Sequence, residues 1–127
     1  MVACGGSSNA EARALLHHLQ GLELEAPLAE RQARIGRLEA LSLHSDELEA
    51  VRDACARAHR RLLEAEVAQA EAKQGLVVAG DLPEGTPSSG LEDLQRSLQR
   101  SEAALARAKA AFPDCRDRSR KLVRKYR

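Results

Sequence analysis

The residues best able to bind a metal ion are the four histidines and three cysteines. His17 and His18 are adjacent, so on a helix they point to different faces and cannot hold one ion together. Cys55 and His59 are four residues apart and share a helix face, which supplies half of a zinc site. We therefore expect no metal and no cofactor, with Cys55 in a helix seam and His59 flanking it toward solvent.

Paired carboxylates are the other source of chemistry, and their spacing is wrong for catalysis. Glu23 and Glu25 are two residues apart, as are Glu64 and Glu66, so each pair points to opposing faces of a helix. Such pairs cannot share one substrate as general acid and base. No glycine-rich loop follows a strand, as a phosphate-binding loop requires. The sequence predicts that the protein is not an enzyme and binds no small molecule.

The carboxyl end carries the strongest charge pattern. Residues 91–127 hold eleven basic and five acidic residues, whereas residues 1–50 hold four arginines and eight acidic residues. The basic residues that we single out as a site for an anionic partner are Arg116, Arg118, Arg120, Lys121, Arg124, Lys125 and Arg127. With apolar residues between them, they can bind nucleic acid, an anionic membrane, or an acidic protein such as a tubulin tail.

A second interpretation of this basic end requires no partner. Cations in the last turn of a helix stabilise the negative end of its dipole. They can also pair with the acidic first arm of the same chain, since residues 1–50 have a net charge of −4 and residues 91–127 a net charge of +6.

The elements that must position these residues are helices. Among the 127 residues, 23 are Ala and 19 are Leu, while Phe and Tyr occur once each and Trp is absent. Ala, Leu, Arg, Glu and Gln are strong helix formers, and so few aromatic residues are untypical of a sheet protein. This composition predicts an all-α fold of long helices.

Capping signals and helix-breaking residues divide the chain. Ser8 and Glu11 have capping-box spacing, and Pro27 can kink the first helix or begin the next. We expect disordered residues 1–8, helical arms over 9–79 with a break near 42–46, and a flexible linker over 80–90 that holds two prolines and three glycines. A last helical arm follows over 91–127, kinked at Pro113.

Two of the arms carry apolar seams with heptad spacing. In both, apolar residues recur at steps of three and four, which places them on one face of a slightly underwound helix. The residues that we expect to bind partner helices are Leu48, Val51, Cys55, Leu62, Leu91, Leu94, Leu98, Leu105 and Phe112. We predict that residues 46–79 and 91–112 pack antiparallel, with Leu62 near the middle of the contact.

Two architectures fit arms of similar length. One is a three-helix bundle running up, down and up, and the other is a helical hairpin whose amino-terminal arm is splayed onto a partner. In either case the seams are narrow and rich in alanine, so little apolar area is buried. We therefore expect the chain to depend on a partner for stability.

A short segment, residues 112–116 with the sequence FPDCR, resembles part of tubulin-binding cofactor A. That family consists of three-helix tubulin chaperones in which a helix also breaks at a proline. The resemblance covers five residues, and it implies a chaperone that binds a folded client.

Three functions follow as hypotheses. The first is a structural subunit that assembles by coiled-coil packing into a larger hetero-oligomeric complex of the kinetochore, centrosomal, augmin-like or tethering type. The second is a stand-alone three-helix chaperone or adaptor, and the third is nucleic-acid or anionic-membrane binding through the basic end.

Location is judged from the cysteines and from hydropathy. Cys4, Cys55 and Cys115 are odd in number and have no metal-ligand or redox-motif spacing, which favours a reducing compartment. No charge-free stretch is long enough for a transmembrane segment. We expect a cytoplasmic or nuclear protein associated with the cytoskeleton.

Overall fold

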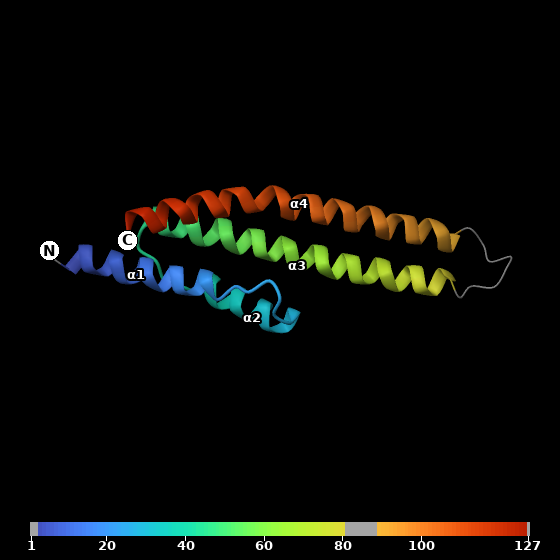
Figure 1. The fold of residues 1–127 in the computed structure, drawn as a ribbon, viewed down its shortest axis with the longest axis horizontal. Helices are drawn as coiled ribbons and strands as arrows, with labels where there is room; N and C mark the ends of the chain where they lie inside the picture. Colours follow the sequence, from blue (N-terminus) through green and yellow to red (C-terminus); the bar gives the residue numbers. More distant parts are fainter. Residues whose placement is uncertain (1–2, 81–88, 127) are drawn as a thin grey trace. The chain divides into compact units, whose positions relative to one another are not determined.

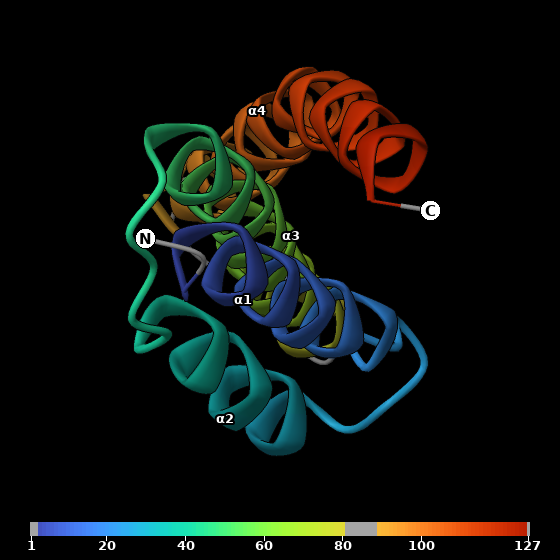
Figure 2. The same cartoon turned by 90° about the vertical axis from the view of Figure 1, so that its left-hand side faces the viewer.

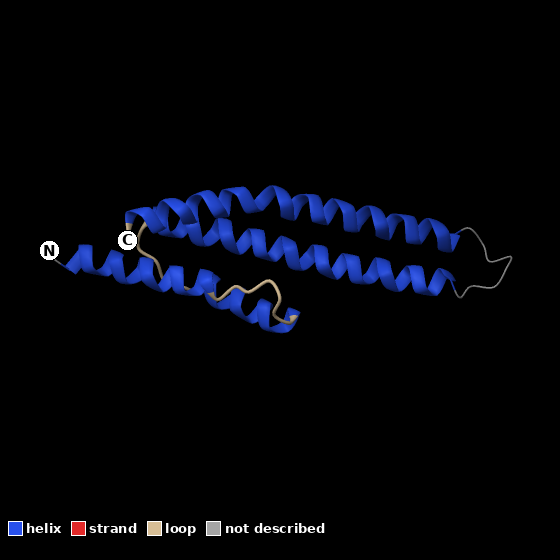
Figure 3. Cartoon of the chain, in the orientation of Figure 1, coloured by secondary structure: helices blue, strands red, loops and turns tan. Residues whose placement is uncertain are grey.

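The computed structural model describes residues 3–80 and 89–126, and within them all regular structure is helical (Figures 1 and 3). The helices are α1 (Ala3–Gln20), α2 (Leu28–Glu39), α3 (Asp46–Gly80) and α4 (Ser89–Lys125). The predicted all-α class is confirmed. The chain divides into two compact units: unit 1 contains residues 1–60 and 111–127, and unit 2 contains residues 61–110.

Helix α1 begins earlier than the capping signal indicates. It starts at Ala3, so residues 3–8 are helical where we expected disorder. A capping residue stabilises a helix end by about 1 kcal/mol, but it does not prevent the preceding residues from continuing the helix. The Ser8 signal was therefore insufficient to locate this boundary.

The first arm is two helices rather than one. Pro27 is the amino-terminal cap of α2, a position where a missing backbone N–H costs nothing. The guanidinium of Arg34 closes the intervening turn: it donates a hydrogen bond of 2.8 Å to the carbonyl oxygen of Gly21 and one of 2.5 Å to Glu30. Of the two roles open to Pro27, the structure shows that it begins the next helix.

Unit 1 is a bundle made of α1, α2, the start of α3 and the end of α4, seen end-on in Figure 2. All four helices contribute to its core, whose fully buried large side chains are Leu15, Ile35, Leu38, Leu48, Leu122 and Cys55. The first arm therefore packs on its own chain rather than splaying away. The chain between α2 and α3 ends at Ser45, whose hydroxyl accepts a hydrogen bond of 3.4 Å from the backbone N–H of Leu48.

Helices α3 and α4 are antiparallel within each unit. In unit 1, Lys125 near the end of α4 pairs at 2.6 Å with Glu47 at the start of α3. In unit 2, Ala65 packs against Ala104 and Ala108, with Leu62 beside them. The predicted hairpin is confirmed, and α4 continues through Pro113 as expected. Of the predicted linker over 80–90, residues 80, 89 and 90 are helical, contrary to the prediction, and residues 81–88 lie outside the described residues.

Gly75 shows how closely the two helices of unit 2 approach. A Cβ atom at this position would lie 3.1 Å from Cδ1 of Leu94. The glycine therefore leaves room for the Leu94 side chain, although it weakens the helix in isolation.

Candidate helix-docking and basic surfaces

The first part of the predicted seam forms the core of unit 1. Leu48, Val51 and Cys55 are 0, 2 and 0% exposed, because the helices of unit 1 cover them. Phe112 is half-buried, and its ring lies edge-on to His59 with 5.2 Å between centroids. Leu48, Val51 and Cys55 hold the chain's own helices together and are closed to an outside partner while unit 1 is folded.

The second part of the seam lies in unit 2 and is more open. Leu62, Leu94 and Leu105 are half-buried. Leu91 and Leu98 are 60% and 37% exposed. These two leucines are therefore available to a partner in the folded chain.

Unit 2 carries most of the exposed apolar surface of the described residues. Nine large apolar side chains are exposed in the described part of the chain. Six of them belong to unit 2: Val67, Leu76, Val77, Val78, Leu91 and Leu98. Its buried cluster, by contrast, consists of Ala65, Ala104 and Ala108. Consecutive residues of a helix point in different directions, so these six lie around the hairpin rather than on one face. Together we call them the hairpin apolar surface. Leu63 is also buried in this unit, but alanines make up most of its interior while most of its large apolar side chains are exposed. An ordinary stable core has the reverse distribution.

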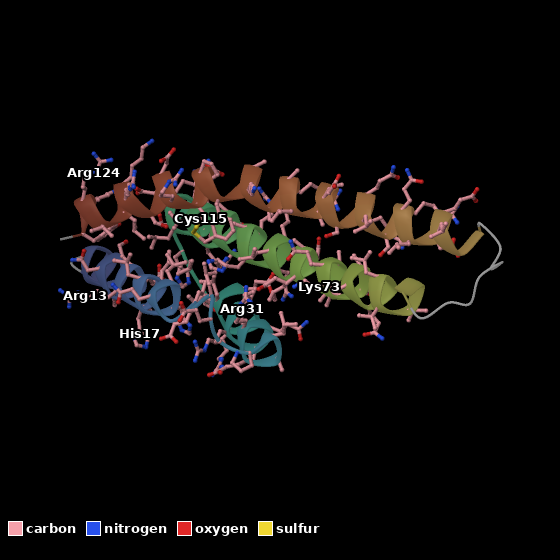
Figure 4. All side chains as sticks on the ribbon, turned by 45° about the vertical axis from the view of Figure 1, so that its right-hand side comes forward. Arg13, His17, Arg31, Lys73, Cys115 and Arg124 are labelled. Carbon is pink, nitrogen blue, oxygen red and sulfur yellow. A yellow bond between two sulfur atoms is a disulfide. The ribbon has the colours of Figure 1, made fainter. Side chains whose placement is uncertain are left out.

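A disulfide joins Cys55 of α3 to Cys115 of α4, with 4.6 Å between their Cα atoms. In the side-chain view of Figure 4, Cys115 lies between these two helices. We did not expect this bond, because a sequence separation of 60 residues has no recognisable spacing. The available signal was that Cys55 lies in one predicted seam and that Cys115 follows Phe112 of the other seam by three residues, on arms predicted to pack antiparallel. A disulfide-bonded Cys55 has no thiolate to offer, so the half zinc site with His59 does not exist.

His59 faces the interior rather than solvent. It is half-buried beside Phe112, and burial, with a smaller effect of the Arg31 charge, lowers the pKa of His59 below its usual 6.5. An uncharged imidazole therefore suits this position. Among the described residues, no group of three His, Cys, Asp or Glu side chains is placed to hold a metal ion.

The basic end is partly neutralised by the chain itself. Arg118 pairs with Asp114 at 2.8 Å, one helical turn away. Lys125 pairs with Glu47, and this hydrogen bond raises the pKa of Lys125. Glu47 is one of the acidic residues of segment 1–50, but it lies at the start of α3 and not in the first arm. Arg127 lies outside the described residues, and Lys121 is exposed.

Three other arginines of this end are exposed to solvent. Arg116, Arg120 and Arg124 line a surface hollow of about 630 Å³ together with Ser119 and Val123. Figure 4 shows Arg124 pointing outward from α4. The predicted site for an anionic partner therefore contains two kinds of cation: those held in ion pairs within the chain and those exposed on the surface.

The pair of Glu11 and His44 ties α1 to the segment before α3. Glu11 accepts hydrogen bonds from the ring Nδ1 of His44 and, at 3.1 Å, from its backbone N–H. The side-chain bond raises the pKa of His44 above 6.5 and lowers the pKa of Glu11 below 4.5. The stabilisation from His44 is complete below pH 6.5 and is lost as pH rises through its raised pKa. The stabilisation from Glu11 is present above pH 4.5 and is lost in stronger acid.

The variants His44→Gln and Glu11→Gln test this pair. We expect each to lower the melting temperature most between pH 4.5 and 6.5, with a smaller loss at pH 8. In a double-mutant cycle, the double variant should lose little more than either single one. Losses that add fully, or that are the same at every pH, would show that the two side chains do not interact in solution.

None of the comparisons with known proteins relates this chain to another. No family model, no curated protein and no solved structure matches it. In the described part of the chain, no helix is long and apolar enough to span a membrane.

Proposed function

We propose that this chain is a non-enzymatic structural subunit that joins a larger multiprotein complex by packing its helices against those of other subunits. The observation that supports the proposal is the hairpin apolar surface around a core in unit 2 that consists mostly of alanine. Two helices alone leave most of each helix open to water, whereas three or four helices enclose a core. Partner helices that cover Leu91 and Leu98 would complete such a bundle.

The finer features of the proposal come from the sequence. Heptad seams in two arms are typical of subunits in coiled-coil assemblies, such as kinetochore, centrosomal, augmin-like or tethering complexes. Partners of that kind are other helical proteins, so the assembly is a hetero-oligomer with a scaffolding role beside the cytoskeleton.

Two pairs of exposed leucines provide the experiment. The variant Leu91→Gln/Leu98→Gln changes the hairpin apolar surface, and the control Leu24→Gln/Leu28→Gln changes two leucines of unit 1 that are 52% and 40% exposed. Each variant is expressed in the native cells and purified with its stoichiometric partners. We expect the first variant to lose those partners and the control to keep them, with circular dichroism unchanged in both.

Two results would contradict the proposal. One is a native chain that purifies without any stoichiometric partner, and the other is a partner that both variants retain. If the purified chain self-associates and this depends on Leu91 and Leu98, the partner at this surface is a second copy of the chain and not another subunit.

A stand-alone chaperone or adaptor is the second candidate. The core of unit 1, with Leu15, Ile35, Leu38 and Leu122 fully buried, favours it, because this unit needs no partner to cover its apolar face. A chaperone would purify alone as a folded monomer and bind its client transiently, whereas a subunit would be recovered in fixed stoichiometry.

The compartment is part of the proposal as well. The cysteine count favours the cytoplasm or nucleus, whereas the Cys55–Cys115 disulfide is a bond that persists in oxidising compartments. Trapping free thiols with maleimide during lysis, followed by mass spectrometry, decides between the two. A labelled Cys55 supports the cytoplasm or nucleus, and an unlabelled one contradicts it.

A further inference from the structure

The cations at the end of α4 differ according to the flank of the helix on which they lie. On one flank, Arg118 and Lys125 are held in ion pairs. On the other, Arg116, Arg120 and Arg124 recur every four residues and are exposed. These three arginines form no ion pair with any residue in the described part of the chain. We call them the arginine stripe.

The stripe has a regular repeat and an apolar component. Because an α-helix rises about 1.5 Å per residue, successive arginines are about 6 Å apart along the axis and the whole stripe covers about 12 Å. Val123, which is 38% exposed, and the half-buried Ser119 lie beside them and line the same hollow. The surface therefore combines three unneutralised guanidinium groups with a small apolar contact.

We propose that the arginine stripe binds an acidic helix of a partner protein. Carboxylates placed every four residues on such a helix follow the same repeat of about 6 Å, so each guanidinium can meet one carboxylate. Arginine suits this role because its planar group donates two parallel hydrogen bonds to a carboxylate. An apolar side chain between two of the acidic residues would cover Val123.

Other anionic partners fit the stripe less well. Single-stranded nucleic acids are held largely by stacking on aromatic side chains, and Tyr126, the one tyrosine of the chain, is half-buried. A membrane surface requires an exposed apolar helix face, but the apolar face of this end is closed, since Leu122 is 0% and Cys115 9% exposed. Val123 alone gives little area for insertion.

This surface belongs to unit 1 and goes beyond the proposed docking through unit 2. The probe is a fluorescent, alanine-based helical peptide of about 20 residues with Glu at every fourth position and one Leu between two of them. Its control is a peptide of the same composition with the Glu residues clustered at one end. Binding to the full chain is followed by fluorescence anisotropy at low salt, where exposed charges are least screened.

The variant Arg116→Gln/Arg120→Gln/Arg124→Gln removes the stripe. The control Arg118→Gln/Lys121→Gln/Lys125→Gln removes three charges from elsewhere on the same helix end. We expect the first to weaken binding about tenfold or more and the second less than about threefold, because spacing as well as charge decides the contact. The peptide with clustered Glu residues should bind the unchanged chain more weakly.

Equal losses in the two variants, or no binding of the peptide at low salt, would overturn the proposal. If an oligothymidine or phosphatidylserine vesicles bind more tightly than the peptide, and this binding is lost with the arginine stripe, that ligand and not an acidic helix is the partner of the stripe. Circular dichroism confirms that both variants fold. The variant Leu91→Gln/Leu98→Gln keeps the stripe and should bind the peptide normally, so this test can fail while the docking proposal stands.

Discussion

Reduction of the Cys55–Cys115 disulfide is expected to lower the stability of the chain by about 4 kcal/mol. The bond closes a loop with a sequence separation of 60 residues, and the chain-entropy model assigns about that much to a loop of this size. For a chain of 127 residues the corresponding fall in melting temperature is on the order of 15 °C. Thermal unfolding followed by circular dichroism, with and without dithiothreitol, measures the change.

The variant Cys55→Ala/Cys115→Ala separates the bond from the reagent. It should melt near the reduced native chain and should not respond to dithiothreitol. Cys4 remains in both proteins and takes no part in the bond. An intact mass that shows three free thiols in the untreated chain would mean that the disulfide does not form, and the native melting temperature would then be the same with and without the reductant.

Truncation of Leu122 is expected to have an effect of similar size. Its side chain is 0% exposed in the core of unit 1, where it anchors the end of α4. The variant Leu122→Ala should lower the free energy of unfolding by roughly 3 to 5 kcal/mol, because it removes buried methyl groups and leaves a cavity. Urea denaturation of the disulfide-bonded chain gives the measurement.

Val123 is the matched control for this substitution. It is the next residue on the same helix and is 38% exposed, so Val123→Ala should change the free energy of unfolding by less than about 0.5 kcal/mol. If Leu122→Ala cost no more than Val123→Ala, the end of α4 would not be packed in solution as the structure has it. The basic end would then be a loose tail.

The heptad seams predicted the pairing of α3 with α4 because periodicity identifies the apolar face of a helix. Periodicity does not identify what covers that face. Leu48 and Leu91 occupy equivalent seam positions, yet the first is 0% and the second 60% exposed. Leu48 belongs to unit 1, whose core includes residues of α1 and α2, whereas Leu91 belongs to unit 2, which is built from parts of α3 and α4. Helix α2 follows α1 through a turn between Gly21 and Pro27. The sequence did not decide whether Pro27 kinks one helix or begins a new one.

The candidate basic site shows the same limit. Composition located the cations in residues 116–127, but it could not say which would be neutralised by the chain itself. That depends on tertiary contacts such as Lys125 with Glu47, which are 78 residues apart. The disulfide escaped prediction for the same reason, because only the antiparallel register of the arms brings Cys55 and Cys115 together.

The disulfide also determines how the chain carries mechanical tension. A force applied between α1 and the end of α4 passes from Cys55 directly to Cys115, so the chain between them is bypassed. An extended chain spans roughly 3.6 Å per residue, so a separation of 60 residues shortens the maximum end-to-end length of the stretched chain by roughly 200 Å. Unit 2, residues 61–110, lies wholly inside the bypassed segment. The hairpin of unit 2 therefore bears none of the applied force until the disulfide is reduced.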